Sequence, residues 1–206
     1  MVYRISKALI RAILRLCFGF QIEGRSHEPR SGAVIVVSNH LSDLDPLVVG
    51  ASLRRRAGFM AKQELFANPL VRWWITACGA FPVRRGEPDR QALRTALELL
   101  HRGGVLVMFP EGTRGLDRTL RPPEPGAAML AVRTRAAILP VAVLGTDEAL
   151  PRGAHRLRRT TIRVRIGAPI SPMDTHALNG RREREAVEAL GRVYMAEIAR
   201  LIASAS

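Results

Sequence analysis

The sequence predicts a single α/β domain, in which a mixed β-sheet is flanked by helices and preceded by an amphipathic N-terminal helix. Short continuous apolar runs of strand length alternate with segments of helical periodicity. The 206 residues suit one domain, and 47% of them are hydrophobic, which is enough to bury a sizeable core. The chain contains neither an internal repeat nor a long linker. We expect residues 1–20 to form the helix and residues 21–206 the α/β domain.

The first segment, residues 2–18, has the pattern of a helix with one basic and one apolar side. Its cations recur at spacings of three and four, and Ile5, Leu9, Ile13 and Leu16 lie mainly off that stripe. Such a helix can lie in a membrane interface with its cations on lipid phosphates, or it can pack on its own domain. The pattern alone leaves both arrangements open. The basic residues are Arg4, Lys7, Arg11 and Arg15.

The remaining elements follow from the hydrophobic pattern in chain order. Continuous β-branched and apolar runs predict buried strands, and apolar residues at every third or fourth position predict helices. Pro140, inside a long apolar run, predicts an edge strand or a bulge because proline cannot donate to a sheet ladder. Strands are expected at residues 33–38, 58–61, 80–83, 105–109, 138–144 and 160–166, and helices at 46–53, 70–77, 90–102, 126–135 and 183–202.

Charge and cysteine content narrow the classes of function. The 32 basic residues against 18 acidic ones give a net charge of +14, which predicts a polyanionic partner: nucleic acid, an anionic membrane or a phosphorylated substrate. Residues 1–30 carry +4 and residues 151–206 carry +6, while the long middle carries only +4. Aromatic residues make up only 5%, without a stacking or zinc-finger pattern, which opposes nucleic-acid binding. Two cysteines exclude a disulfide framework and a four-cysteine zinc site.

No part of the sequence is long and apolar enough to span a membrane. The longest run without a charged residue, 31–42, has twelve residues, whereas a span needs roughly 20. Arginines recur throughout the first helix, so the apolar core of a signal peptide is missing. We therefore expect a cytoplasmic protein.

Two of the predicted strands end in side chains suited to chemistry. After the first buried strand come Asn39 and His40, followed by Asp43 and Asp45. An imidazole can take a proton from a hydroxyl group, and a carboxylate on its other nitrogen fixes the tautomer. Asp45 and Asp43 both compete for that role, and Asp45 can also simply start a helix. No motif supplies a serine or cysteine nucleophile, so His40 would activate a substrate hydroxyl directly.

The second such strand end is the sequence Glu-Gly-Thr-Arg at residues 111–114. Its glycine permits a tight turn that presents backbone amides, and Arg114 can bind a phosphate bidentately. Glu111 can instead pair with that arginine, and a plain β-turn is the simplest alternative. Two more cations follow predicted strands, Lys62 and Arg84. Together with Arg114 they would form a phosphate pocket beside a base.

The ordered blocks NHLSDLD, AKQELFANPLV, GAFPVRR, FPEGTR and ILPVAVLGT resemble the glycerophospholipid acyltransferases, and more narrowly the bacterial 1-acyl-sn-glycerol-3-phosphate (lysophosphatidate) acyltransferases. They run from about Gly32 to Thr146. A lone histidine-x4-aspartate match is weak, but the ordered set is specific. The chain departs from the family pattern at Gly115, where serine is common, and at residues 121–125.

The resemblance implies a function and a set of roles. His40 would be the general base that deprotonates the sn-2 hydroxyl of lysophosphatidate, and Asp45 would orient it. The hydroxylate would attack the thioester of acyl-CoA or acyl-carrier protein directly, without an acyl-enzyme, a metal or a redox cofactor. Asn39 and Pro140 would have structural or acyl-substrate roles. The implied phosphate site comprises Lys62, Phe81, Arg84, Glu111, Gly112, Thr113 and Arg114.

The implied substrates are amphiphiles, so the resemblance favours a membrane-interface helix, with Arg4, Lys7, Arg11 and Arg15 on lipid phosphates. The expected partners are an anionic membrane surface, a lysophospholipid acceptor and the acyl donor, but no nucleic acid. We expect a peripheral protein on the cytoplasmic face of the cell membrane. The departures from the family pattern leave another lysolipid, a glycolipid or an amino-acid lipid open as the acceptor. The sequence carries no signal of the oligomeric state.

Overall fold

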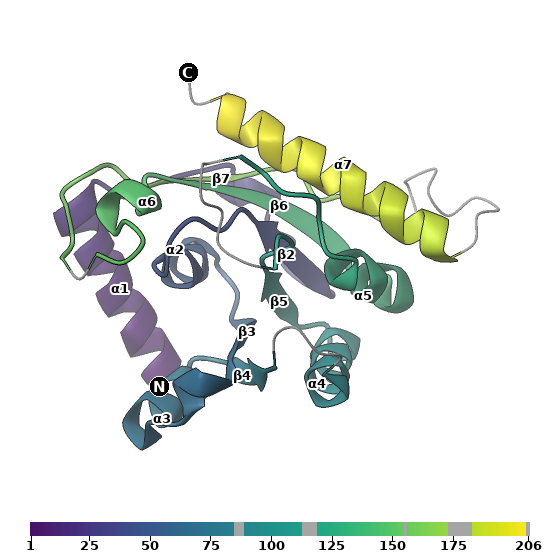
Figure 1. Cartoon of the computed structure of the whole chain (residues 1–206), viewed down its shortest axis with the longest axis horizontal. Helices are drawn as coiled ribbons and strands as arrows, with labels where there is room; N and C mark the ends of the chain where they lie inside the picture. The colour runs from purple at the N-terminus through teal and green to yellow at the C-terminus, as the bar shows by residue number, and fades with distance from the viewer. Residues whose placement is uncertain (85–88, 113–118, 155, 173–182, 205–206) are drawn as a thin grey trace.

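A seven-stranded sheet forms the centre of the computed structural model, with helices over both of its faces (Figure 1). The structure describes residues 1–84, 89–112, 119–154, 156–172 and 183–204. The strands are β1 Gln21–Glu23, β2 Val34–Ser38, β3 Ala57–Lys62, β4 Ala80–Val83, β5 Val105–Met108, β6 Ala137–Leu144 and β7 Arg163–Ile166. Their order is β1-β7-β6-β2-β5-β3-β4, and β7 runs antiparallel to β6, so the sheet is mixed, as predicted.

Alternate residues of β2 enter two separate cores. Val34 and Val36 pack in the core that includes α1 and α2, whereas Ile35 and Val37 pack in the core that includes α4, α5 and α7. Because both faces are covered, the strand is apolar throughout rather than alternating. The helices are α1 Val2–Phe18, α2 Asp45–Ser52, α3 Pro69–Ala77, α4 Arg90–His101, α5 Gly126–Thr134, α6 Thr146–Ala149 and α7 Glu183–Ala203, with 3-10 turns η1 Arg25–His27 and η2 Gln63–Phe66.

The parallel strands bring the chemically interesting segments to one edge of the sheet. β2, β5, β3 and β4 are neighbours and run in the same direction, so their carboxyl ends lie together. His40 follows β2, Glu111 follows β5, Lys62 ends β3 and Arg84 follows β4. In open sheets of this kind, ligands bind beyond the carboxyl ends of the strands.

Pro140 corrects one of the sequence predictions. It lies in β6, between β7 and β2, so the edge-strand interpretation is wrong. The bulge interpretation fits, because Pro140 and Ile138 are two residues apart while their partners, Gly167 and Ile170, are three apart. The carbonyl oxygen of Pro140 accepts a hydrogen bond from the N–H of Gly167. Proline has no N–H to donate, and Pro140 therefore lies at a position where the regular hydrogen-bond ladder to β7 has already ended.

Two of the cations predicted to bind lipid phosphates point into the protein instead. The Lys7 ammonium donates to the carbonyl oxygens of Arg54 and Arg55, at 3.4 and 3.3 Å. The Arg11 guanidinium donates to the carbonyls of Ala51 and Leu53. These carbonyls lie at and just beyond the C-terminal end of α2, where the helix dipole is negative. The prediction that Lys7 and Arg11 face the membrane is therefore wrong, while Arg4 and Arg15 are exposed.

The apolar side of α1 faces outward. Ile5, Leu9, Ile13 and Leu16 are 57%, 59%, 44% and 78% exposed, whereas Leu14 on the opposite side is buried. Among the described residues, no helix combines the length and the hydropathy of a membrane span. The apolar row is therefore exposed on a helix whose other side packs against the domain.

Burial of Lys7 predicts a pH-dependent contribution to stability. Desolvation, followed by the charge of Arg11, lowers the pKa of Lys7 from 10.5 to about 8. Between these two pH values Lys7 is protonated in the unfolded chain but largely neutral in the folded one, so the free energy of unfolding should rise with pH. The side chain is only partly buried, which limits the expected rise to about 1 kcal/mol. We expect this rise from pH 7 to 9.5 in urea unfolding, and a flatter profile for Lys7→Met. Parallel profiles for the two proteins would contradict it.

Candidate functional site

His40 and Asp45 form a buried pair at the carboxyl end of β2. The Nδ1 atom of His40 lies 2.9 Å from Oδ2 of Asp45, and the two residues are 5% and 0% exposed. The same oxygen accepts the backbone N–H groups of Leu41 and Ser42, each at 2.7 Å. The hydrogen bond resolves the choice between Asp45 and Asp43 in favour of Asp45. Asp45 is also the first residue of α2, but Leu44 is at the N-cap position and no side chain caps the helix, so the N-cap interpretation of Asp45 is wrong.

The histidine ring is fixed from two further directions. It stacks on Phe109, with ring centroids 4.2 Å apart and an interplanar angle of 24°. Its backbone N–H donates to Oε1 of Glu111 at 3.1 Å. With Nδ1 held by Asp45, Nε2 is the ring nitrogen left for a substrate. A histidine held in this way can take a proton from a hydroxyl group.

Glu111 connects the two motifs that the sequence singled out. Its carboxylate accepts the N–H of His40 on one oxygen and the N–H of Arg121, at 3.2 Å, on the other. Glu111 is only 6% exposed, and a carboxylate in that position would repel a phosphate. Through these contacts Glu111 links the His40 loop to Arg121, while its expected part in the phosphate site stays a prediction.

Asn39 has a structural role that is visible in its hydrogen bonds. Its side-chain amide donates to the carbonyl of Val143 and its side-chain oxygen accepts the N–H of Val143, both at 2.8 Å. The side chain thus substitutes for one residue of β-pairing to β6 after β2 has ended. This pairing fixes the direction in which the chain enters the His40 loop.

The predicted phosphate-binding cations lie at the ends of neighbouring strands. Lys62 is exposed and stands opposite Val83 in the β3–β4 register, so Arg84 follows directly beside it. Phe81 is part-buried in the core under these ends. The Arg84 guanidinium lies 3.6 Å from Asp89, whose carboxylate also accepts the backbone N–H of Arg84.

The glycine of the second motif is in the conformation that the turn requires. Gly112 has φ of 70°, in the left-handed region, and its N–H donates to the carbonyl of Phe109. Thr113 and Arg114 lie outside the described residues. The structure therefore brings His40, Asp45, Lys62, Arg84 and Glu111 to one edge of the sheet, while the placement of Thr113 and Arg114 remains a prediction.

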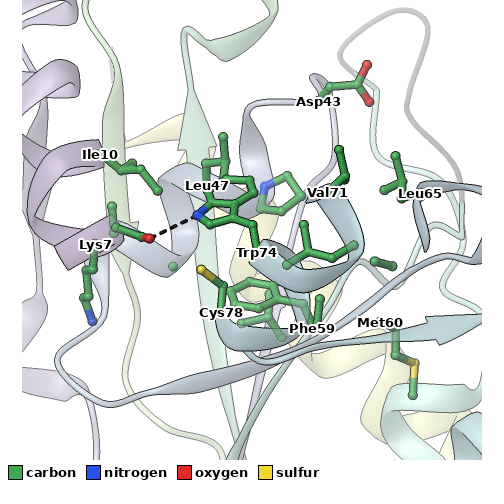
Figure 2. A pocket seen from close by; sticks show the side chains of 18 of the residues that line it. Lys7, Ile10, Asp43, Leu47, Phe59, Met60, Leu65, Val71, Trp74 and Cys78 are labelled. Carbon is green, nitrogen blue, oxygen red and sulfur yellow. Dashed lines mark hydrogen bonds between the residues drawn. The ribbon is translucent and has the colours of Figure 1, made fainter. Parts of the chain in front are cut away.

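A mostly apolar cavity of about 380 Å³ extends from His40 into the protein, between α1, α2, α3 and strands β3 and β4 (Figure 2). Leu47 and Gly50 line it from α2, Phe59 from β3, and Trp74 from α3. The indole N–H of Trp74 donates to the Ser6 hydroxyl at 3.0 Å, which ties α3 to α1 across the cavity. A cavity of this size and character fits an extended apolar ligand group.

The two ends of this cavity are far apart. His40 and Phe109 lie at the carboxyl edge of the sheet, while Tyr3, Lys7 and Cys78 line the opposite end. By the strand register, Ala80 at the start of β4 is level with Val36 in β2, so Cys78 and His40 lie beyond opposite ends of these strands. The cavity is therefore a long channel whose polar end holds the histidine.

Sequence reasoning missed most of the residues that form this channel. They come from separate elements, and each has an ordinary apolar pattern for its own helix or strand. The structure makes this visible at α3, whose residues Val71, Trp74 and Ile75 are apolar although no residue of that helix is buried. The stacking partner Phe109 was counted only as the last residue of a strand.

The comparisons with known proteins define the class of this chain. A family model described as Acyltransferase matches residues 19–144, which include His40, Asp45 and Glu111. The chain belongs to this acyltransferase family.

Several relatives within the family are 1-acyl-sn-glycerol-3-phosphate acyltransferases. A chloroplastic one from Arabidopsis thaliana is 34% identical over 157 residues, covering 74% of this chain and 44% of that protein. One from Bacillus subtilis is 26% identical over 193 residues, covering 93% of this chain and 94% of that protein. A lyso-ornithine lipid O-acyltransferase from Pseudomonas aeruginosa is 33% identical over 141 residues, covering 68% of this chain and 54% of that protein.

The fold is similar to a solved structure over almost its whole length. The crystal structure of the 1-acyl-sn-glycerophosphate (LPA) acyltransferase PlsC from Thermotoga maritima superimposes with a TM-score of 0.81 at 26% identity. The match covers 98% of this chain and 80% of that one. This chain spans less than half the length of the Arabidopsis relative and nearly all of the Bacillus one.

Proposed function

We propose that this chain transfers a fatty acyl group from a thioester donor, acyl-CoA or acyl-carrier protein, to the sn-2 hydroxyl of lysophosphatidate, which gives phosphatidate. The observation that carries the proposal is the buried His40–Asp45 pair at the polar end of a long apolar channel. The family membership and the relatives described above support the same reaction class.

In the proposed mechanism His40 acts as a general base and Asp45 as the group that orients it. Nε2 of His40 takes the proton of the acceptor hydroxyl while the oxygen attacks the thioester carbonyl. The tetrahedral intermediate collapses by breaking the C–S bond, and the imidazolium returns its proton to the leaving thiolate. Asp45 stabilises the imidazolium in between, and no acyl-enzyme forms. General-base assistance of this kind contributes about 10²- to 10⁴-fold to the rate.

The surroundings of the pair divide into two substrate regions. The apolar channel suits the acyl chain of the donor, because its lining is mostly apolar. The exposed cations Lys62 and Arg84, together with Arg114, suit the phosphate of the acceptor at the carboxyl edge of the sheet. The thioester and the hydroxyl would then meet at His40.

A substitution at the inner end of the channel should shorten the preferred acyl chain. Cys78 lines that end, so a phenylalanine there would fill space that the last carbons of a long chain occupy. We expect Cys78→Phe to lower kcat/KM roughly tenfold or more for long-chain acyl-CoA and to leave short-chain donors nearly unchanged. The matched control is Cys17→Phe on the exposed face of α1. An unchanged chain-length profile for Cys78→Phe would remove the acyl chain from this channel.

An acceptor panel tests the proposed reaction itself. We expect turnover with lysophosphatidate and much less with lyso-ornithine lipid or with an acceptor that lacks a phosphate, at one acyl-CoA. Arg114→Ala should raise KM for lysophosphatidate at least tenfold with a smaller change in kcat, because it removes positioning rather than the base. Equal turnover of phosphorylated and phosphate-free acceptors would identify another acceptor class and remove Arg114 from the phosphate site.

The membrane part of the proposal rests on α1. Its exposed apolar row suits insertion into a bilayer interface, and both proposed substrates reside there. We therefore propose a peripheral protein at the cytoplasmic face of the cell membrane, with Arg4 and Arg15 at the headgroup level. Lys7 and Arg11 have no part in this contact, because carbonyl groups of the domain hold them.

A further inference from the structure

The inward direction of Lys7 and Arg11 raises the question of which surface responds to lipid charge. Without these two cations, the outward side of α1 is mainly apolar and carries only Arg4 and Arg15. Apolar insertion is largely indifferent to the charge of the headgroups, whereas basic residues near the surface respond to anionic lipid. The basic residues that could contact anionic lipid are therefore to be sought on another part of the surface as well.

The connection between α6 and β7 carries a group of exposed arginines. Residues 150–162 contain no acidic residue. Each of the arginines in the connection is exposed, and none forms an ion pair within the part of the chain that the structure describes. Leu157, which lies between two of them, is 56% exposed. The four arginines are Arg152, Arg156, Arg158 and Arg159.

The last residue of this connection is hydrogen-bonded to the end of α1. The N–H of Ile162 donates to the carbonyl of Phe18 at the end of α1, and the N–H of Gln21 donates back to the carbonyl of Ile162. Figure 1 shows the connection and α6 next to the C-terminal half of α1, on the side of the molecule away from α4 and α7. Leu16, the most exposed residue of the apolar row at 78%, belongs to this half of α1.

The same connection is attached to the catalytic loop. The Ser42 hydroxyl donates to the carbonyl of Leu150 at 3.0 Å, and the N–H of Ser42 is one of the three donors on Asp45. A membrane surface that binds at this connection would therefore lie close to the carboxyl edge of the sheet, where His40 faces the channel.

We propose that residues 150–154 and 156–162 form a docking surface for anionic lipid, with Arg152, Arg156, Arg158 and Arg159 on headgroup phosphates and Leu157 inserted among them. This surface continues the apolar row of α1, so that α1 supplies mainly apolar affinity and the arginines of the connection supply most of the selectivity for anionic bilayers. The proposal rests on the proposed function only in taking the substrates to be membrane lipids. An exposed leucine among the arginines and an apolar helix beside them favour a bilayer over an acidic carrier protein.

The test compares vesicles of phosphatidylcholine with vesicles that also contain phosphatidylglycerol. For the triple variant Arg156→Gln, Arg158→Gln, Arg159→Gln we expect sedimentation with the anionic vesicles to weaken at least tenfold, since each basic residue near such a surface is worth about 1 kcal/mol, or roughly fivefold. Sedimentation with the neutral vesicles should be unchanged. The matched control, Arg94→Gln, Arg184→Gln, Arg192→Gln, removes the same charge from exposed positions on α4 and α7 and should bind anionic vesicles like the unmodified chain.

The outcomes separate this proposal from its rivals. Equal losses of anionic-vesicle binding in the two triple variants would show that only net charge matters and would overturn the docking surface. Unchanged binding by the triple variant at Arg156, Arg158 and Arg159 would also overturn it. A loss confined to turnover with acyl-carrier protein would assign the arginines to the donor instead. Turnover of a water-soluble short-chain lysophosphatidate without vesicles should be unaffected in every variant. If the unmodified chain lacked that turnover, the proposed function would fail while the vesicle result would stand.

Discussion

Replacing His40 by alanine should lower acyl transfer to lysophosphatidate by at least 10³-fold. The substitution removes the base from the polar end of the channel, and no other histidine lines that cavity among the described residues. Asp45 would keep its hydrogen bonds to the N–H groups of Leu41 and Ser42, so the loop should retain its shape. The loss should therefore appear in kcat, with KM for both substrates nearly unchanged.

The measurement is a steady-state transfer assay, accompanied by circular dichroism and vesicle sedimentation. The matched control is His101→Ala, at the exposed end of α4, which should behave like the unmodified chain. Retained turnover in His40→Ala, with intact folding, would rule out the proposed general base. If His40→Ala also lost its fold, His40→Gln would separate the two effects. Glutamine keeps a polar side chain against Phe109 but lacks the basicity of imidazole.

Replacing Asp45 by asparagine should lower kcat about 10²- to 10⁴-fold without disrupting the loop. One carboxylate oxygen, Oδ2, accepts all three hydrogen bonds, and the other, Oδ1, is buried without a hydrogen-bond partner among the described residues. An asparagine can place its oxygen at the first position and its amide at the second. The change removes the negative charge that stabilises the imidazolium, while the geometry remains.

Asp43→Asn provides the comparison for this variant. Asp43 lines the same cavity, and it was the other carboxylate that the sequence allowed as a partner of His40. We expect it to change kcat by less than about tenfold, since the hydrogen bond from the imidazole goes to Asp45. The double variant His40→Ala, Asp45→Asn should be no slower than His40→Ala, because residues that act as one unit are not additive. Equal effects of Asp43→Asn and Asp45→Asn would contradict the assigned pairing.

The parts of the fold that the sequence predicted well depend on local patterns. β2 and β5 were predictable because both faces of the sheet are covered, which makes their residues apolar without alternation. The His40–Asp45 pair was predictable because five residues after a buried strand are enough for a turn that returns to the histidine. The spacing alone left Asp43 open as the partner, since it has almost the same reach, and only the family resemblance pointed to Asp45.

The features that escaped prediction depend on contacts between distant segments. The direction of α1 is set by the carbonyls at residues 51–55, which hold Lys7 and Arg11 and turn the apolar row outward. An amphipathic pattern predicts that a helix has two different sides, but it does not predict which side packs against the domain. The role of Glu111 depends on the N–H of Arg121, and the channel requires α1, α2 and α3 to be in place together.

The contacts of α1 with α2 limit how the protein can be engineered. Lys7 and Arg11 hold carbonyls at the far end of a helix of eight residues, about 12 Å long, whose first residue is Asp45. Tyr3, Ser6 and Ile10 of α1 also line the channel. Truncating the chain before β1, a natural way to obtain a version that does not bind lipid, would therefore also open one wall of the channel and release the helix that presents Asp45. Point substitutions on the outward side of α1 are the better route to such a protein.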